Sequence, residues 1–194
     1  MSTLLKATEA FVTHLLTVDL DPRFLYHNLE HTRRVVQSTK ELIGHYDLTG
    51  KEENALLLAA WLHDTGYIHG REGHEKKSSQ IAEKYLLEQG EDSGTVQQVC
   101  NLIMATERYH KPRNLMEEII RDADASHLGQ PIFEDVSELL KKELALMDIA
   151  HYTPGEWRQL HVEIFRNEHH FHTAYARKHW QPGKDRNLIS LLKG

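Results

Sequence analysis

The chain has 194 residues, of which 27% are charged and 40% are hydrophobic, enough for a buried core in one domain or at most two small ones. Its formal net charge of −6 argues against wrapping duplex nucleic acid, and its single cysteine, Cys100, excludes an intramolecular disulfide and any multi-cysteine metal site. The longest unbroken apolar run, Ala55 to Leu62, is far shorter than the roughly 20 residues of a membrane-spanning helix.

Helical periodicity runs along nearly the whole chain. Apolar residues recur three and four positions apart, the spacing that places side chains on one face of an α-helix. The run from Ala55 to Leu62 is apolar on all sides and predicts a central buried helix. Thr49 and Thr153 each precede a glutamate by three residues, which predicts capped helix starts. Because no strand pattern or repeat is found, we expect an all-α single domain, a helical bundle of roughly eight helices. The apolar stripes lie at residues 4–16, 29–46, 55–62, 81–86, 96–104, 116–123 and 133–147.

The last third of the chain is unusually rich in histidine. The segment Gln181 to Asp185 contains Pro and Gly, and we expect it to break the last helix before a short tail at residues 188–192. A solvated helix anchored by aromatic residues is the favoured interpretation of the histidine-rich stretch; a wall of the substrate pocket or a dimer contact is the alternative. The histidines that we place on this predicted helical stretch are His161, His169, His170, His172 and His179.

Residues that bind metals gather in four places. The chain has 15 histidines, more than its 5 phenylalanines and 7 tyrosines together, and imidazole is well suited to bind a transition metal. The pair His63-Asp64 ends the buried apolar run, where a carboxylate is costly unless it is paired or bound to a cation. The other places are residues 26–31, 69–75 and 122–124. One such histidine is usually an ordinary residue, but the four segments together predict a metal site.

This order of residues resembles the HD-domain superfamily of metal-dependent phosphohydrolases, whose pattern is a His, an adjacent His-Asp pair and a later Asp on an all-α core. The matching residues here would be His31, His63, Asp64 and Asp124. The chain further resembles a group of stand-alone predicted HD phosphohydrolases. The resemblance implies a single HD-type domain over residues 1–194. Its HD core would cover about residues 20–130, and about residues 131–194 would form a C-terminal helical extension.

The resemblance also implies a divalent transition metal held by those four residues. Nitrogen and oxygen ligands without sulfur suit Mn, Fe, Co, Ni or Zn rather than Ca. Some members of the superfamily hold a second metal through extra histidines. His74 fits the first of these, and His110 is the candidate for the next, so one ion and two ions both stay open.

The last ligand has two candidates. Asp122 and Asp124 lie two residues apart and cannot share one face of a helix. The family pattern favours Asp124 as the metal ligand. Asp122 would then be a neighbouring hydrogen-bond acceptor or a helix cap.

We expect an enzyme that hydrolyses a small phosphate ester, with a nucleotide as the favoured substrate. A metal lowers the pKa of its bound water from about 15.7 towards about 7. Asp64 would take the water's proton, and His74 or Glu75 would protonate the leaving oxygen. Because the protein is acidic overall, local cations must bind the phosphate. The cationic candidates for substrate binding are Arg33, Arg34, Arg71 and Lys77.

Two other functions stay open. One is a di-iron HD-type oxygenase, which the lack of a histidine near Thr106 disfavours, and the other is a non-catalytic module that binds a metal or a nucleotide. The start of the chain has no basic leader followed by an apolar stretch, so we expect a cytoplasmic protein. We expect no duplex nucleic acid and no membrane as partners, and a homodimer stays open.

Overall fold

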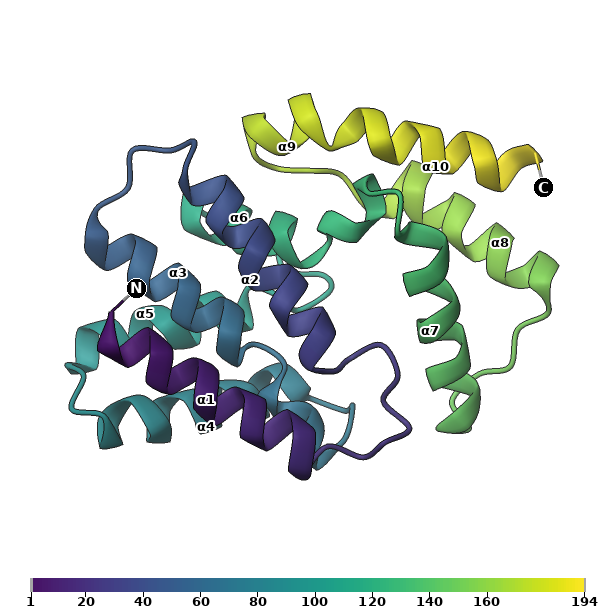
Figure 1. Cartoon of the computed structure of the whole chain (residues 1–194). Coiled ribbons are helices and arrows are strands. Elements are labelled where there is room, and N and C mark those ends of the chain that lie inside the picture. Colours follow the sequence, from purple (N-terminus) through teal and green to yellow (C-terminus); the bar gives the residue numbers. More distant parts are fainter. Residues whose placement is uncertain (1, 194) are drawn as a thin grey trace. The chain divides into compact units, whose positions relative to one another are not determined.

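The structure is a computed structural model that describes residues 2–193, and every regular element in this range is helical (Figure 1). The all-α prediction is therefore confirmed, with slightly more helices among the described residues than the eight expected. The helices are α1 (Thr3–Val18), α2 (Leu29–Ile43), α3 (Gly50–Leu62), η1 (Thr65–His69), α4 (His74–Glu88), α5 (Ser93–Met104), α6 (Leu115–Asp124), η2 (Ser126–Gly129), α7 (Phe133–Leu146), α8 (Pro154–Glu163), η3 (Ile164–Glu168), α9 (Ala174–His179) and α10 (Gln181–Lys193).

The chain folds into two compact units. The first contains residues 2–21 and 27–124, and the second contains residues 22–26 and 125–193. The boundary after residue 124 lies near the predicted end of the HD core at about residue 130. A single HD-type domain over the whole chain stays a prediction.

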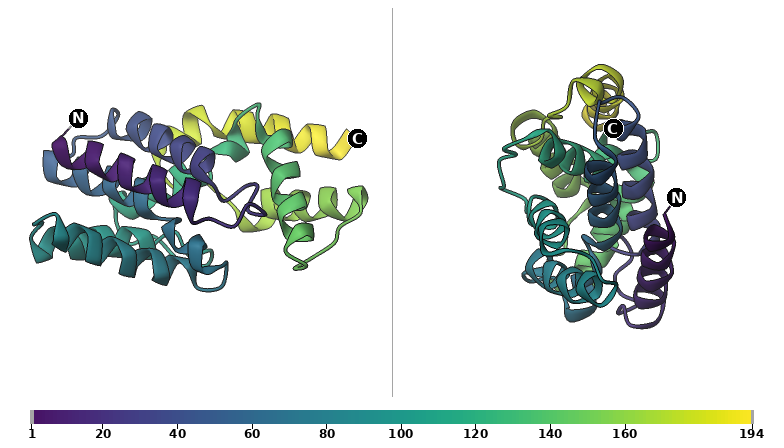
Figure 2. Two further views of the ribbon diagram at one scale, coloured as in Figure 1. Left: turned by 60° about the horizontal axis from the view of Figure 1, so that its bottom comes forward. Right: turned by 90° about the vertical axis from the view of Figure 1, so that its left-hand side faces the viewer.

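Helix α3 is the centre of the first unit. Helices α1, α2, α4, α5 and α6 all contact it, and the views in Figures 1 and 2 show it surrounded by neighbouring helices. Six of its apolar side chains, including Leu58 and Leu62, have no exposed surface, which confirms the predicted central helix. The predicted capping box is also present: the Thr49 hydroxyl accepts from the Glu52 N–H, and the Glu52 carboxylate accepts from the Thr49 N–H at 2.8 Å.

The short helix η1 packs closely on the first turn of α4. The Gly66 N–H donates to Ser78 Oγ at 2.8 Å, and Lys77 Nζ donates to the His69 carbonyl at 2.9 Å. A Cβ atom at Gly66 would lie 2.1 Å from the His74 carbonyl oxygen and 2.7 Å from the Ser78 nitrogen. Because both are backbone atoms that cannot move aside, only glycine allows this approach.

Replacing Gly66 by alanine is therefore expected to destabilise the protein strongly. Overpacking usually costs about 1–3 kcal/mol, and a clash with backbone places this variant at the upper end, about 3 kcal/mol. Urea unfolding followed by circular dichroism measures the loss. Gly50→Ala is the matched control, because a Cβ at Gly50 meets nothing within 4 Å and alanine favours the helix by up to about 1 kcal/mol. If both variants unfolded at the same urea concentration, the close approach would be wrong.

The second unit has its own core. Leu128, Phe133 and Phe165 are buried together, and apolar residues from α10 pack against them. Glu143 is buried and accepts the Tyr26 N–H at 2.8 Å, which ties residues 22–26 to α7. Helix α8 begins with the predicted capping box at Thr153.

Two sequence predictions for this unit are wrong. The segment Gln181 to Asp185 begins α10 rather than breaking a helix, because Pro182 lies in the first turn, where a missing N–H leaves no bond unmade. The histidines do not share one helical stretch either, since residues 169–173 form an irregular connection between η3 and α9. Thr173 caps α9, its side chain accepting the Ala176 N–H, and a new cap requires the chain to enter from outside the helix.

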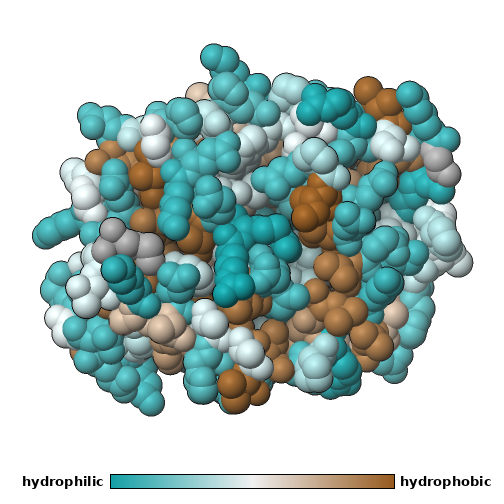
Figure 3. Space-filling view, viewed as in Figure 1, coloured by the Kyte–Doolittle hydropathy of each residue, from teal (hydrophilic) through white to brown (hydrophobic). Residues whose placement is uncertain are grey.

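No helix between residues 2 and 193 combines the length and the hydropathy needed to cross a membrane. In Figure 3, hydrophilic side chains cover much of the visible face, with apolar side chains between them.

Candidate metal centre

Helix ends bring the candidate ligands together within the first unit. The Asn28 side chain accepts the N–H groups of Glu30 and His31, at 2.9 Å and 3.2 Å, and so caps α2 and places His31 in its first turn. His63 ends α3 with Asp64 directly after it, and Asp124 is the last residue of α6. Since α2, α3 and α6 contact one another, these ends meet in one place.

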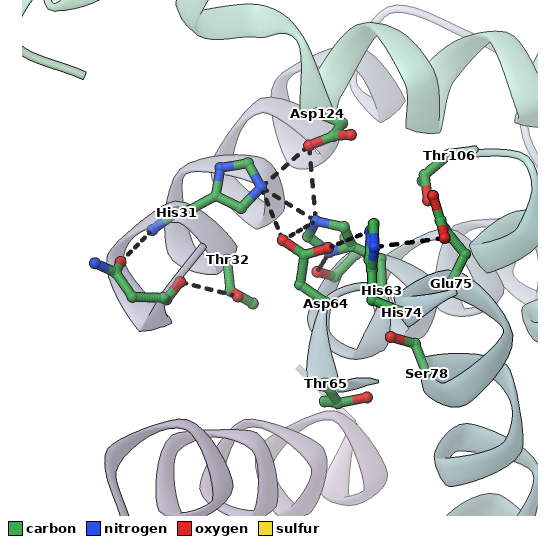
Figure 4. A network of polar contacts seen from close by, with 12 residues as sticks. His31, Thr32, His63, Asp64, Thr65, His74, Glu75, Ser78, Thr106 and Asp124 are labelled. Atoms are coloured by element: carbon green, nitrogen blue, oxygen red, sulfur yellow. Dashed lines mark hydrogen bonds and ion pairs between the residues drawn. The ribbon is translucent and has the colours of Figure 1, made fainter. Parts of the chain in front are cut away.

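Four side chains point toward one another at this place (Figure 4). His31 Nε2 lies 3.3 Å from His63 Nε2, 3.2 Å from Asp64 Oδ2 and 3.1 Å from Asp124 Oδ1. His63 Nε2 lies 3.3 Å from Asp64 Oδ2 and 3.7 Å from Asp124 Oδ1. The Asp124 side chain is 31% exposed while the other three are at most 6% exposed, so the cluster opens to solvent at Asp124.

The hydrogen bonds around the cluster leave acceptor atoms facing one another. His63 Nδ1 lies 3.0 Å from the Ala60 carbonyl, which can only accept, so Nδ1 carries the proton and Nε2 of the neutral ring carries a lone pair. Asp64 Oδ2 is buried, and only a protonated Nε2 of His31 or His63 could donate a hydrogen bond to it. Because buried acceptors without a donor are costly, the arrangement requires either extra protons or a cation.

The donor set fits a divalent transition metal. Nitrogen and oxygen ligands lie about 2.0–2.2 Å from such an ion, which separates neighbouring ligands by about 3.0 Å at right angles and about 3.4 Å at tetrahedral angles. The observed separations of 3.1–3.7 Å agree. His31, His63 and Asp124 offer atoms that all lie within 4.8 Å of one another, and Asp64 Oδ2 contacts both imidazoles. Two carboxylates would also balance the charge of a divalent ion.

The pKa values of the cluster reflect the same crowding. Burial by itself would lower the pKa of His31 and of His63, but the hydrogen bonds and charges of Asp64 and Asp124 raise both above the usual value. Burial would likewise raise the pKa of each carboxyl group, but the two imidazoles hold both well below the usual range. Without a metal, the two carboxylates therefore favour protonated imidazoles.

A family comparison agrees with this geometry. The family model described as HD domain matches residues 28–129, more than half of the chain. The chain belongs to the HD-domain family. HD domains form a superfamily of metal-dependent hydrolases, and the matched range contains the whole cluster from His31 to Asp124. Searches among curated proteins and among solved structures found no match.

Two further predicted residues of this HD domain lie beside the cluster. His74 begins α4 directly after Gly73, whose φ of 62° lies in the left-handed region that favours glycine. His74 Nδ1 lies 3.0 Å from the Arg71 carbonyl, and its Nε2 lies 3.8 Å from Asp64 Oδ1. Glu75 Oε2 lies 3.4 Å from His74 Nδ1.

The second-metal candidate His110 has another partner. Its Nε2 lies 2.8 Å from Glu117 Oε2, and the buried Glu117 also accepts the Arg113 N–H at 2.9 Å. Asp122 is fully buried and does not belong to the group of ligand atoms. The structure therefore brings His74 to the cluster but engages the His110 nitrogen elsewhere.

The cationic candidates differ in their surroundings. Arg33 binds Glu30 on its own helix at 2.6 Å, and Lys77 Nζ donates to the His69 carbonyl. Arg34 is half-buried on α2, and Arg71 is exposed next to the start of α4. Arg71 is tied to the cluster by its carbonyl oxygen, which His74 contacts.

Sequence reasoning missed one buried residue beside the site. The Tyr67 ring is 2% exposed, stacks on the His27 ring and lies against the His74 ring at a tilt of 33°. The signal available in the sequence was its position three residues after Asp64. That position alone does not predict a ring stack, because the stack depends on how η1 meets α4.

Proposed function

We propose that this HD-domain protein is a metal-dependent phosphohydrolase that cleaves a small phosphate ester, with a nucleotide as the favoured substrate. The observation that carries the proposal is that each of the two imidazole nitrogens lies 3.1–3.7 Å from an oxygen of both carboxylates. His31, His63, Asp64 and Asp124 would hold the ion. Mn, Fe, Co, Ni and Zn all suit this mixed set of ligands.

When bound, such a metal supplies a water of lowered pKa and neutralises charge on phosphoryl oxygens. Asp64 directs Oδ2 at the imidazoles and Oδ1 toward His74, so Oδ1 is placed to accept a proton. His74 keeps its own proton on Nδ1 through the Arg71 carbonyl, which leaves Nε2 to take that proton and return it to the leaving oxygen. Glu75 Oε2, 3.4 Å from His74 Nδ1, would help to hold the ring in this orientation.

The number of ions is part of the proposal. One ion needs only the four residues of the cluster. A second would draw on Asp64 Oδ1 and His74 Nε2, and it would gain His110 only if that residue exchanged Glu117 for the metal.

Arg71 is the leading candidate for phosphate binding, because it is exposed and adjoins His74 through its carbonyl. Arg34 is the second candidate. Arg33 and Lys77 would first have to give up the Glu30 carboxylate and the His69 carbonyl. A homodimer, a cytoplasmic location and the lack of nucleic-acid and membrane partners stay predictions.

The test uses protein stripped with a chelator and reloaded separately with Mn, Fe, Co, Ni or Zn. Phosphate release is measured from nucleoside mono-, di- and triphosphates and from simple phosphomonoesters, and elemental analysis counts the ions per chain. We expect release only after reloading. Asp64→Asn should lower kcat/KM by at least about 100-fold, because it removes a proton acceptor and a charged ligand together.

Two results would contradict the proposal. Two irons per chain with oxygen uptake and no phosphate release would identify an oxygenase. Saturable nucleotide binding without release, for every metal, would identify a binding module.

A further inference from the structure

Three aromatic rings stack beside the candidate metal centre. The His27 and Tyr67 rings lie 4.2 Å apart between centroids and nearly parallel, at 16°. The Tyr67 and His74 rings lie 4.1 Å apart at 33°. The rings come from the segment before α2, from η1 and from the first residue of α4, so the stack joins three separate parts of the first unit.

The middle ring of the stack is fixed firmly. Tyr67 is 2% exposed, and the η1 helix that carries it lies against α4 through the Gly66 N–H and Ser78. The close approach at Gly66 leaves η1 no room to move nearer to α4. Tyr67 is therefore a fixed, buried surface, whereas the His74 side chain is 18% exposed.

The orientation of His74 decides which nitrogen faces the cluster. As the ring stands, Nδ1 points to the Arg71 carbonyl and Nε2 to Asp64 Oδ1. A rotation of the ring would break both contacts, the one with the Arg71 carbonyl and the one with Asp64 Oδ1. The face of Tyr67 lies 4.1 Å from the His74 ring at a tilt of 33° and limits how far that ring can turn out of its plane. It therefore obstructs the turn that would exchange the positions of the two nitrogens, while the Arg71 carbonyl selects Nδ1 as the protonated one.

We propose that Tyr67 and His27 are positioning residues that hold the His74 imidazole with Nε2 toward Asp64. His27 stacks on Tyr67, Tyr67 lies against His74, and the centroids of the two histidine rings are 6.4 Å apart. The effect of this positioning on catalysis rests on the proposed function of His74. The orientation of the ring can be tested without that function.

The first test determines the tautomer of the His74 imidazole in the metal-free protein. Long-range ¹⁵N–¹H spectra of the histidine side chains report which ring nitrogen carries the proton. We expect one tautomer, protonated at Nδ1, in the wild-type protein and in Tyr67→Phe, which keeps the ring. Tyr67→Leu should show both tautomers. An unchanged single tautomer in Tyr67→Leu would overturn the inference.

Tyr85→Leu is the matched control for general loss of packing. Tyr85 is also buried and stacked, on Phe11 at 4.3 Å and 12°, but away from His74. We expect this variant to lose stability and to keep the wild-type His74 tautomer. A mixture of tautomers in Tyr85→Leu would mean that loosened packing anywhere is sufficient, and it would also overturn the inference.

The second test measures turnover of the reloaded enzyme. Removal of a residue that orients a metal-site group typically costs 10–100-fold, so Tyr67→Leu and His27→Ala should lower kcat by about that factor. Metal content should stay unchanged and KM should change little. Tyr67→Phe should recover most of the loss, which a role of the hydroxyl would not allow.

His74→Ala distinguishes a failure of the proposed role of His74 from a failure of the positioning role of Tyr67. If it turns over like the wild type, the proposed role of His74 fails, while the tautomer spectra still decide the positioning role. If His74→Ala is inactive but Tyr67→Leu is fully active, the positioning inference fails and the proposed function stands.

Discussion

Asp124→Asn is expected to abolish tight metal binding and hydrolysis, whereas Asp122→Asn, two residues earlier on α6, is expected to retain both. Asp124 Oδ1 lies 3.1 Å and 3.7 Å from the two imidazole nitrogens, while Asp122 is buried outside the group of ligand atoms. Structural zinc sites bind with roughly 10–16 kcal/mol, or about 3 kcal/mol for each of four ligands. Loss of one ligand therefore weakens binding by roughly 100-fold.

Competition with a chromophoric chelator measures the affinity, and phosphate release measures the activity. Each substitution replaces a carboxylate by an amide of the same shape, so the pair differs in position and not in chemistry. Asp122→Asn should lower the free energy of unfolding, because it alters a fully buried group. If Asp122→Asn lost the ion and Asp124→Asn kept it, the ligand assignment would be reversed.

The predictable part of the fold follows from local signals. A helix that is apolar on all sides, such as residues 55–62, removes its side chains from water only when other elements cover every face. The central position of α3 could therefore be predicted from the sequence. The capping boxes at Thr49 and Thr153 join residues three apart and need no tertiary context. The start of α10 was misread because Pro182 and Gly183 are compatible with both a break and a first turn. The packing of the second unit decides between them.

In the site, too, some residues could be predicted from the sequence and others depend on the tertiary structure. The order His31, His63-Asp64 and Asp124 is visible in the sequence, and the structure gathers these residues because α2, α3 and α6 contact one another. The partner of His110 could not be predicted from the sequence, because it depends on how the loop that carries His110 meets the first turn of α6, where Glu117 lies. Tyr67 could not be predicted for a similar reason, because its ring contacts depend on how three separate segments pack together.

The stability that a bound metal adds is expected to increase with pH. In the metal-free protein, the raised pKa values of His31 and His63 add stability that is fully present below about pH 6.5 and is lost as the pH rises through the raised values. The lowered pKa values of Asp64 and Asp124 add stability that is present above about pH 3.8 and is lost as the pH falls. A metal needs both imidazoles unprotonated, so it must displace the protons that stabilise the metal-free cluster.

The expected effect is large. Below the raised pKa values of both histidines, binding releases up to two protons, so the affinity should rise by up to about 100-fold per pH unit. At a fixed concentration of metal, each 100-fold gain in affinity adds about 2.7 kcal/mol to the free energy of unfolding. Thermal unfolding at pH 5, 6, 7 and 8, with a chelator or with excess metal, measures the increment. The increment should be small at pH 5 and should level off above the raised histidine pKa values.

Taking the difference between the two conditions isolates the cluster from other histidines. Burial lowers the pKa of His161, and burial together with nearby cations lowers that of His169 to about 2. Both histidines therefore destabilise the folded protein at low pH, with metal or without it, and their contributions cancel in the difference. Asp124→Asn is the control variant, and its increment should be smaller than that of the wild-type protein by about 2.7 kcal/mol wherever the wild-type site is filled. An increment in the wild-type protein that stayed constant from pH 5 to pH 8 would contradict a site built on two imidazoles, because carboxylate ligands alone are already ionised throughout that range.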